Sequence, residues 1–322
     1  MKPYASLSLD LDNQWSYMKT HGDSGWQSHP SYLDTAVPRI LEFLAARGLT
    51  ITFFIVGQDA ALPKNRAALA SIAAAGHEIG NHSFRHEPWL HLYTAPELDQ
   101  ELRQAEDAIE AATGARPRGF RGPGFSLSAA TLETLCRRGY DYDATVFPNL
   151  LNPLARAYLF STSKLTDEEK QQRSALFGTW KDAFRPVRPF EWGLAGGKLL
   201  EIPVTTLPML KLPMHLSYLI YLAKFSRMTA RAYLRFALAA CRLTGTQPSI
   251  LLHPLDFLGG EDCAPLAFFP GMDVARGRKL AIVAELFDIL QARRELVTMG
   301  EHARRAAAAR EELRTLTPVF PA

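Results

Sequence analysis

Two carboxylates and two imidazoles are spaced in this sequence as a hydrolytic metal centre needs them. Asp10 and Asp12 end an alternating apolar and polar run, Ser6–Asp12, which predicts a strand with both carboxylates at its carboxyl edge. His82 and His86 lie four residues apart, so both rings can face one ion from a helical turn or a tight loop. Two neutral imidazoles and one carboxylate also leave coordination positions open for water and substrate.

The spacing of the two histidines is a weak indication by itself, because two exposed or core-satisfied histidines show the same pattern. The motifs around them are more informative: the pair follows a short apolar strand, and Phe120–Ser126 and Ile250–Pro254 supply further polar candidates. With these motifs the chain resembles the polysaccharide deacetylase family, the NodB-homology carbohydrate esterases of family 4. It is most similar to the branch with Asp-x-Asp in the first motif, which also contains peptidoglycan deacetylases and cyclic-imide hydrolases. The resemblance runs from about Leu7 to His253, and Thr52–Gly57 resembles the second barrel strand.

The resemblance implies a metal site. Asp12, His82 and His86 match the three metal ligands of the family. Zinc is favoured because two imidazoles and a carboxylate suit a borderline-soft cation, with cobalt, nickel or manganese as alternatives.

The resemblance also implies three catalytic residues. Asp10 matches the carboxylate that acts as general base, Arg121 the arginine that orients this base, and His253 the histidine that protonates the leaving amine. The chemistry is consistent with these roles, because a divalent ion lowers the pKa of its water toward neutrality and a nearby carboxylate can then take the proton. A histidine that titrates near neutrality suits the role of the acid.

Two motifs depart from the family pattern. The third normally reads Arg-x-Pro-x-Gly, whereas here Pro123 is followed directly by Gly124 and then by Phe125, so the substrate-binding loop is expected to run differently. The fourth motif has no clean match. Asp143 and Asp256 therefore remain as alternative candidates for the carboxylate that tunes the acid histidine.

The elements that must position these residues alternate along the chain. Strand-like runs such as Ile51–Val56 and Leu199–Val204 are separated by helix-like segments such as Pro96–Thr113. This alternation predicts an α/β fold with functional residues at strand ends. The resemblance implies a distorted (β/α)7-type barrel in a single domain over residues 1–322, with a long insertion at about 150–246.

Composition sets further bounds. With 322 residues, of which 47% are hydrophobic, the chain can bury a large core, and no linker of Pro, Gly and Ser divides it. Its three cysteines are scattered, which argues against a disulfide framework and a thiolate metal site. The sequence enters its first strand without a basic and then apolar leader, which predicts a cytoplasmic protein.

Basic residues recur near the end of the presumed insertion. Lys224, Arg227, Arg231, Arg235 and Arg242 would share one face if this stretch is helical. A solvated face of a barrel helix is one interpretation; contact with the inner face of a membrane or with a phosphate-bearing substrate is the other. A net charge of only +3, without a nucleic-acid motif, argues against nucleic-acid binding.

Three functions are compatible with these observations. The preferred one is metal-dependent removal of an N-acetyl group from an acetamido sugar in a polysaccharide, peptidoglycan or lipid-linked glycan precursor. The second is hydrolysis of a small cyclic amide by the same metal centre. The third is a catalytically silent glycan-binding protein. The sequence does not indicate the oligomeric state.

Overall fold

The computed structural model describes residues 3–174, 176, 180–309 and 313–320, and it has the α/β architecture expected from the sequence. The strands are β1 (Tyr4–Asp10), β2 (Thr52–Ile55), β3 (Glu78–Asn81), β4 (Gly119–Phe120), β5 (Tyr142–Asp143), β6 (Phe190–Leu194), β7 (Gly197–Glu201), β8 (Ser249–Leu252), β9 (Glu295–Val297) and β10 (Thr315–Leu316). The helices are α1 (Gln14–His21), α2 (Leu33–Ala45), α3 (Gly57–Ala61), α4 (Arg66–Ala74), α5 (Ala95–Thr113), α6 (Ala129–Arg137), α7 (Asn152–Thr162), α8 (Asp167–Gln172), α9 (Leu216–Phe225), α10 (Arg227–Leu243), α11 (Arg276–Arg293) and α12 (Met299–Ala308).

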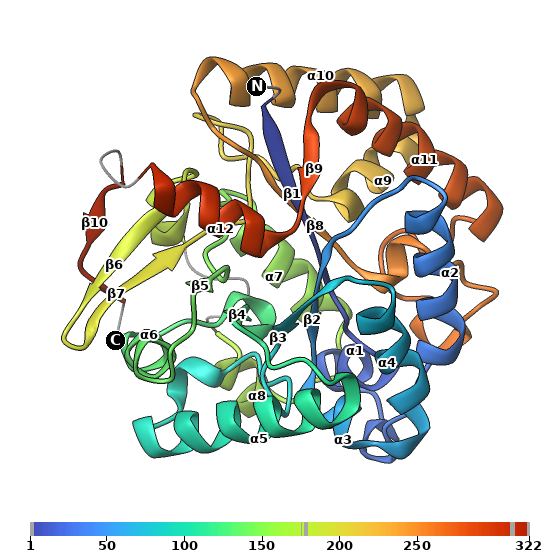
Figure 1. The fold of residues 1–322 in the computed structure, drawn as a ribbon. Coiled ribbons are helices and arrows are strands. Elements are labelled where there is room, and N and C mark those ends of the chain that lie inside the picture. The colour runs from blue at the N-terminus through green and yellow to red at the C-terminus, as the bar shows by residue number, and fades with distance from the viewer. Residues whose placement is uncertain (1–2, 175, 177–179, 310–312, 321–322) are drawn as a thin grey trace.

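The strands form one ten-stranded sheet in the order β10-β6-β7-β5-β4-β3-β2-β1-β8, with β9 also paired to β1. All of the pairings are parallel except β6 with β7, which form an antiparallel hairpin (Figure 1). Parallel pairing aligns the carboxyl ends of β1, β3, β4 and β8, so the residues that follow these strands meet at one edge. The predicted mostly parallel, barrel-like fold is confirmed.

The barrel is not closed by strand pairing among the described residues. The chain that leaves β7 instead reaches β8 through one backbone hydrogen bond, from Thr205 N to the Ser249 carbonyl oxygen at 3.0 Å. Phe147, Val204 and Leu251 form a small buried cluster at this junction.

The segment 150–246 contributes both to the sheet and to the hydrophobic core. It contributes the β6–β7 hairpin to the sheet, and helices α9 and α10 to the main hydrophobic core beside α2, α4 and α11. Cys136, Cys241 and Cys263 are free; the last two are buried, and Cys136 is partly exposed. Among the described residues, no helix is both long and apolar enough to cross a bilayer.

Candidate active site

The two aspartates of the first motif lie at the carboxyl end of β1 in a tightly held loop. Asp10 is the last residue of the strand, and Asp12 follows it just before α1. Asn13 caps α1 and donates a hydrogen bond from Nδ2 to Asp59 Oδ1 at 2.7 Å. The Tyr32 hydroxyl donates to the carbonyl oxygen of Asp12 at 2.5 Å. These bonds fix the backbone that presents both carboxylates.

The two histidines lie in the loop that follows β3. His82 comes directly after the strand, and His86 adopts the left-handed conformation with φ 52°. The buried carboxylate of Glu101 on α5 accepts backbone hydrogen bonds from Phe84 at 2.9 Å and from Arg85 at 2.6 Å. The loop is thus a strained turn held by a helix side chain, and not the turn of a helix.

The structure brings Asp12, His82 and His86 into one cluster. Asp12 Oδ1 lies 2.9 Å from His86 Nε2 and 3.4 Å from His82 Nε2, and the candidate ligand atoms all lie within 4.8 Å of one another. The Asp12 side chain is 13% exposed, which leaves the cluster open on one side. Burial alone would raise the pKa of Asp12, but the imidazoles of His86 and His82 hold it well below its ordinary range.

This donor set fits a divalent metal ion. His82 Nδ1 lies 2.7 Å from the carbonyl oxygen of Arg121, so this nitrogen carries the hydrogen and donates it. The Nε2 lone pair of His82 is then free toward Asp12, which is the arrangement that metal-ligating histidines show. Two imidazole nitrogens and one carboxylate oxygen suit zinc and neighbouring transition metals.

Asp10 forms a buried ion pair with Arg121. Arg121 Nη1 donates to Asp10 Oδ1 at 2.7 Å and to Ser8 Oγ at 2.8 Å, while Nε donates to the Ala144 carbonyl oxygen at 2.9 Å. The guanidinium, which is fully buried, also lies 4.4 Å from the ring centre of Phe54. Because three acceptors and one ring fix its plane, Arg121 can hold the Asp10 carboxylate in a single orientation.

His253 follows β8 at the same edge of the sheet. Its Nδ1 lies 3.2 Å from Ser217 Oγ on α9, and Ser217 donates to Asp256 Oδ1 at 2.7 Å. Asp256 Oδ2 also accepts from the backbone N–H of His253 at 2.9 Å. Since the Ser217 hydroxyl donates to Asp256, it accepts from His253 Nδ1, and the other ring nitrogen is left for substrate. Burial raises the pKa of Asp256, and a charge on His253 opposes this rise.

Asp143 is not brought to His253. The structure buries it between β5 and β7, where it pairs with Glu201 and accepts a hydrogen bond from Thr145 Oγ1 at 2.6 Å. Burial, together with the Glu201 carboxylate, raises the pKa of Asp143 well above its ordinary value. Glu201, whose own pKa burial also raises, accepts hydrogen bonds from Trp192 Nε1 and from a backbone N–H. Of the two candidates for tuning the histidine, only Asp256 contacts it.

The loop Pro123–Phe125, where the third motif departs from the family pattern, forms a short 3-10 turn after β4. Gly124 has φ 58°, and a Cβ on this residue would lie 2.6 Å from a methyl carbon of Leu176, so glycine is required on both counts. Phe125 packs against Phe147 with ring centres 4.7 Å apart. The two rings begin an aromatic wall that continues through His215 to Tyr218.

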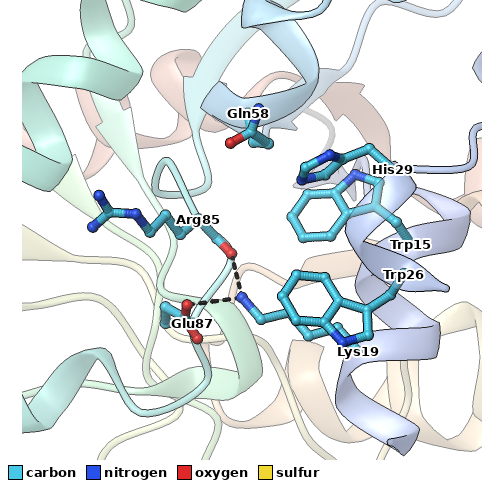
Figure 2. A pocket seen from close by; sticks show the side chains of 7 residues that line it. All are labelled: Trp15, Lys19, Trp26, His29, Gln58, Arg85 and Glu87. Atoms are coloured by element: carbon cyan, nitrogen blue, oxygen red, sulfur yellow. Dashed lines mark hydrogen bonds and ion pairs between the residues drawn. The ribbon is translucent and has the colours of Figure 1, made fainter. Parts of the chain in front are cut away.

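A cavity of about 130 Å³ lies beside the histidine loop (Figure 2). The ring of Trp15, which lines it, is 6.3 Å from that of His86. Lys19 pairs with Glu87 at 2.8 Å against the cavity wall. The full lining consists of Trp15, Lys19, Trp26, His29, Gln58, Arg85 and Glu87. Sequence reasoning missed this cavity because its residues come from separate loops with no shared spacing.

Comparisons with known proteins find partial matches to one family. The polysaccharide deacetylase family model matches residues 23–142, a region that contains both histidines, Arg121 and the Pro123–Phe125 loop. A peptidoglycan deacetylase from Helicobacter pylori is 28% identical over 120 residues, which are 37% of this chain and 40% of that protein. A chitin deacetylase from Pestalotiopsis sp is 31% identical over 102 residues, 31% of this chain and 34% of that protein. The chain thus spans less than half the length of these two relatives.

The likeness in fold extends further than the likeness in sequence. A solved structure from Mycobacterium smegmatis that is assigned to the polysaccharide deacetylases superposes with a TM-score of 0.64. It covers 100% of this chain and 96% of its own, at 21% identity. The match therefore supports one fold over the whole chain, including 143–322, which the family model does not match.

Proposed function

We propose that this chain, whose residues 23–142 belong to the polysaccharide deacetylase family, is a metal-dependent hydrolase that removes the N-acetyl group from an acetamido sugar. One observation carries the proposal. The Asp12, His82 and His86 cluster, the Asp10–Arg121 pair and the Ser217-held His253 all follow strands that end at one edge of the sheet. A base, an acid and a ligand cluster are the parts that amide hydrolysis requires.

The chain's own residues divide the chemistry as follows. A divalent ion held by Asp12, His82 and His86 would supply a water of lowered pKa and would polarise the amide carbonyl. Asp10 takes the proton from the attacking water, and Arg121 holds its carboxylate in one orientation. His253 gives its proton to the leaving nitrogen, with Ser217 fixing the plane of its ring.

Two features support an acetamido sugar as the substrate. Two relatives that match about a third of the chain are named for peptidoglycan and chitin, both of which are built from such sugars. The walls of the site also offer aromatic rings on two sides, with Phe125 on one loop and Trp15 in the neighbouring cavity. Rings of this kind pack against the apolar faces of small rigid ligands.

A small cyclic amide is the second candidate. The cavity beside the histidine loop, at about 130 Å³, matches a single small ring better than a sugar chain. An assay on chitin oligomers, N-acetylated peptidoglycan fragments and cyclic imides, with metal-loaded protein, separates the two candidates. Hydrolysis of the imides alone would replace the deacetylase assignment.

The roles of Asp10 and His253 are tested by substitution on the substrate that this panel identifies. Asp10→Asn and His253→Ala are expected to keep the metal and to lose about 10²- to 10⁴-fold in rate, since each removes one proton-transfer group. Asp107→Asn, on the exposed side of α5, is the matched control and should retain full rate. Near wild-type turnover in either site variant would remove that residue from the mechanism.

A further inference from the structure

Helix α10 carries an apolar ridge on its outer side. Met228, Phe236 and Leu243 are 78%, 58% and 89% exposed, and the exposed Ala232 and Ala239 lie between them. The five residues follow one another at intervals of four, four, three and four, which keeps them on one helical face. Figure 1 shows α10 along an outer edge of the molecule. The opposite face of the helix is buried in the main core through Ala230, Leu234, Ala237, Leu238 and Cys241.

Three arginines run beside this ridge. Arg231, Arg235 and Arg242 are exposed, and none of them forms an ion pair with any described residue. α10 contains no Asp or Glu. The guanidinium groups therefore form a row of uncompensated positive charge along one border of the apolar ridge.

The structure corrects the larger basic face expected from the sequence. Lys224 belongs to α9, because the helix is interrupted at Ser226, whose side chain caps the start of α10. Lys224 pairs with Asp273, and Arg227 pairs with Glu285 at 2.9 Å. Three of the five expected basic residues therefore remain available, and the exposed apolar side chains beside them are Met228, Phe236 and Leu243.

We propose that this face of α10 docks on the surface of an anionic lipid bilayer. A surface helix with exposed apolar side chains bordered by arginines matches the interfacial helices that lie in the membrane plane. The apolar ridge would enter the acyl boundary, and Arg231, Arg235 and Arg242 would bind lipid phosphates. A second copy of the chain paired antiparallel through α10 is a poor occupant, because this symmetry would bring arginines against arginines.

Flotation tests the charge component of this proposal. Purified protein comprising residues 1–322 is mixed at low salt with vesicles of phosphatidylglycerol and phosphatidylcholine, or with vesicles of phosphatidylcholine alone. Wild type should float with the anionic vesicles only, and binding should weaken as salt is raised. The variant Arg231→Gln, Arg235→Gln, Arg242→Gln should bind about 100-fold more weakly, at roughly fivefold for each arginine.

The matched control removes the same charge elsewhere. Arg66, Arg103 and Arg314 are exposed and form no ion pair with any described residue, and they lie outside α10, so their Gln variant should float like wild type. Equal binding by both triple variants, or no binding of wild type to anionic vesicles at low salt, would overturn the proposal.

The apolar component has its own variant. Phe236→Ser with Leu243→Ser leaves every arginine in place, and it should also lower vesicle binding, because the ridge supplies buried area in the bilayer. Retention of full binding would overturn insertion of the ridge. Sedimentation that showed a dimer lost in this variant would assign the face to a second copy instead. None of these measurements uses turnover, so their outcome is independent of the proposed deacetylase activity.

Discussion

Substitutions at Asp10 and Arg121 should have strongly non-additive effects on the free energy of unfolding, because the two side chains form a buried ion pair. Arg121→Met removes three donated hydrogen bonds and leaves the Asp10 carboxylate, 4% exposed, without its counter-charge. Breaking a buried pair in this way costs about 3–5 kcal/mol of unfolding free energy. Asp10→Asn strands the guanidinium and should cost a similar amount. The double variant has no unpaired charge. Its loss of unfolding free energy should therefore be smaller than the sum of the two single losses by about 2 kcal/mol or more.

Urea unfolding of the four proteins at neutral pH, with a chelator present, measures this coupling. The exposed pair Arg118 and Asp141 is a matched control, because its distance of 2.7 Å equals that of the buried pair while both side chains are more than half exposed. Its coupling should stay within about 1 kcal/mol. If the losses at Asp10 and Arg121 simply add, or if the control pair couples as strongly, burial is not the source of the interaction.

Three further predictions concern other parts of the molecule. His82→Ala and His86→Ala should each lose stoichiometric divalent metal by elemental analysis, and unchanged metal content in both would exclude the ligand assignment. Glu101→Ala should weaken metal binding about 10- to 100-fold, because it removes the acceptor for two backbone N–H groups of the histidine loop. Glu101→Gln keeps an acceptor and should restore the affinity. Equal metal affinity in wild type and both variants would show that these hydrogen bonds are dispensable for metal binding. Burial lowers the pKa of His302 to about 3, so the unfolded chain binds the extra proton between pH 6.5 and 3, and stability falls as pH drops through that window. His302→Asn should reduce this slope by up to about 1.4 kcal/mol per pH unit in unfolding titrations, and an unchanged slope would contradict the reasoning.

Much of the site was predictable because its residues follow strands. Alternation over Ser6–Asp12 places Asp10 at the end of β1. The apolar run before His253 likewise places this histidine directly after β8. A parallel sheet then aligns these ends without further information. The roles of the residues came from family resemblance, and they remain predictions that the substitutions above test.

The supporting residues could not be predicted in the same way. Asp59, Glu101 and Ser217 act through hydrogen bonds to loops distant in sequence, and no periodicity encodes such contacts. Asp143, one of the two candidates that the sequence leaves open, does not contact His253, because it lies in β5 and pairs with Glu201. Glu201 lies 55 residues after Val146 and accepts a hydrogen bond from the Val146 N–H. Only the register of β5 against β7 shows that Glu201 lies beside Asp143.

Arg121 serves two neighbouring groups through different atoms. Its side chain holds Asp10, whereas its main-chain carbonyl fixes the hydrogen on His82. Substitution at this position changes the first contact and preserves the second, since every amino acid carries the same carbonyl group. One codon change at position 121 could therefore remove the partner of Asp10 in evolution, while the contact that orients His82 in the cluster of Asp12, His82 and His86 is inherited unchanged.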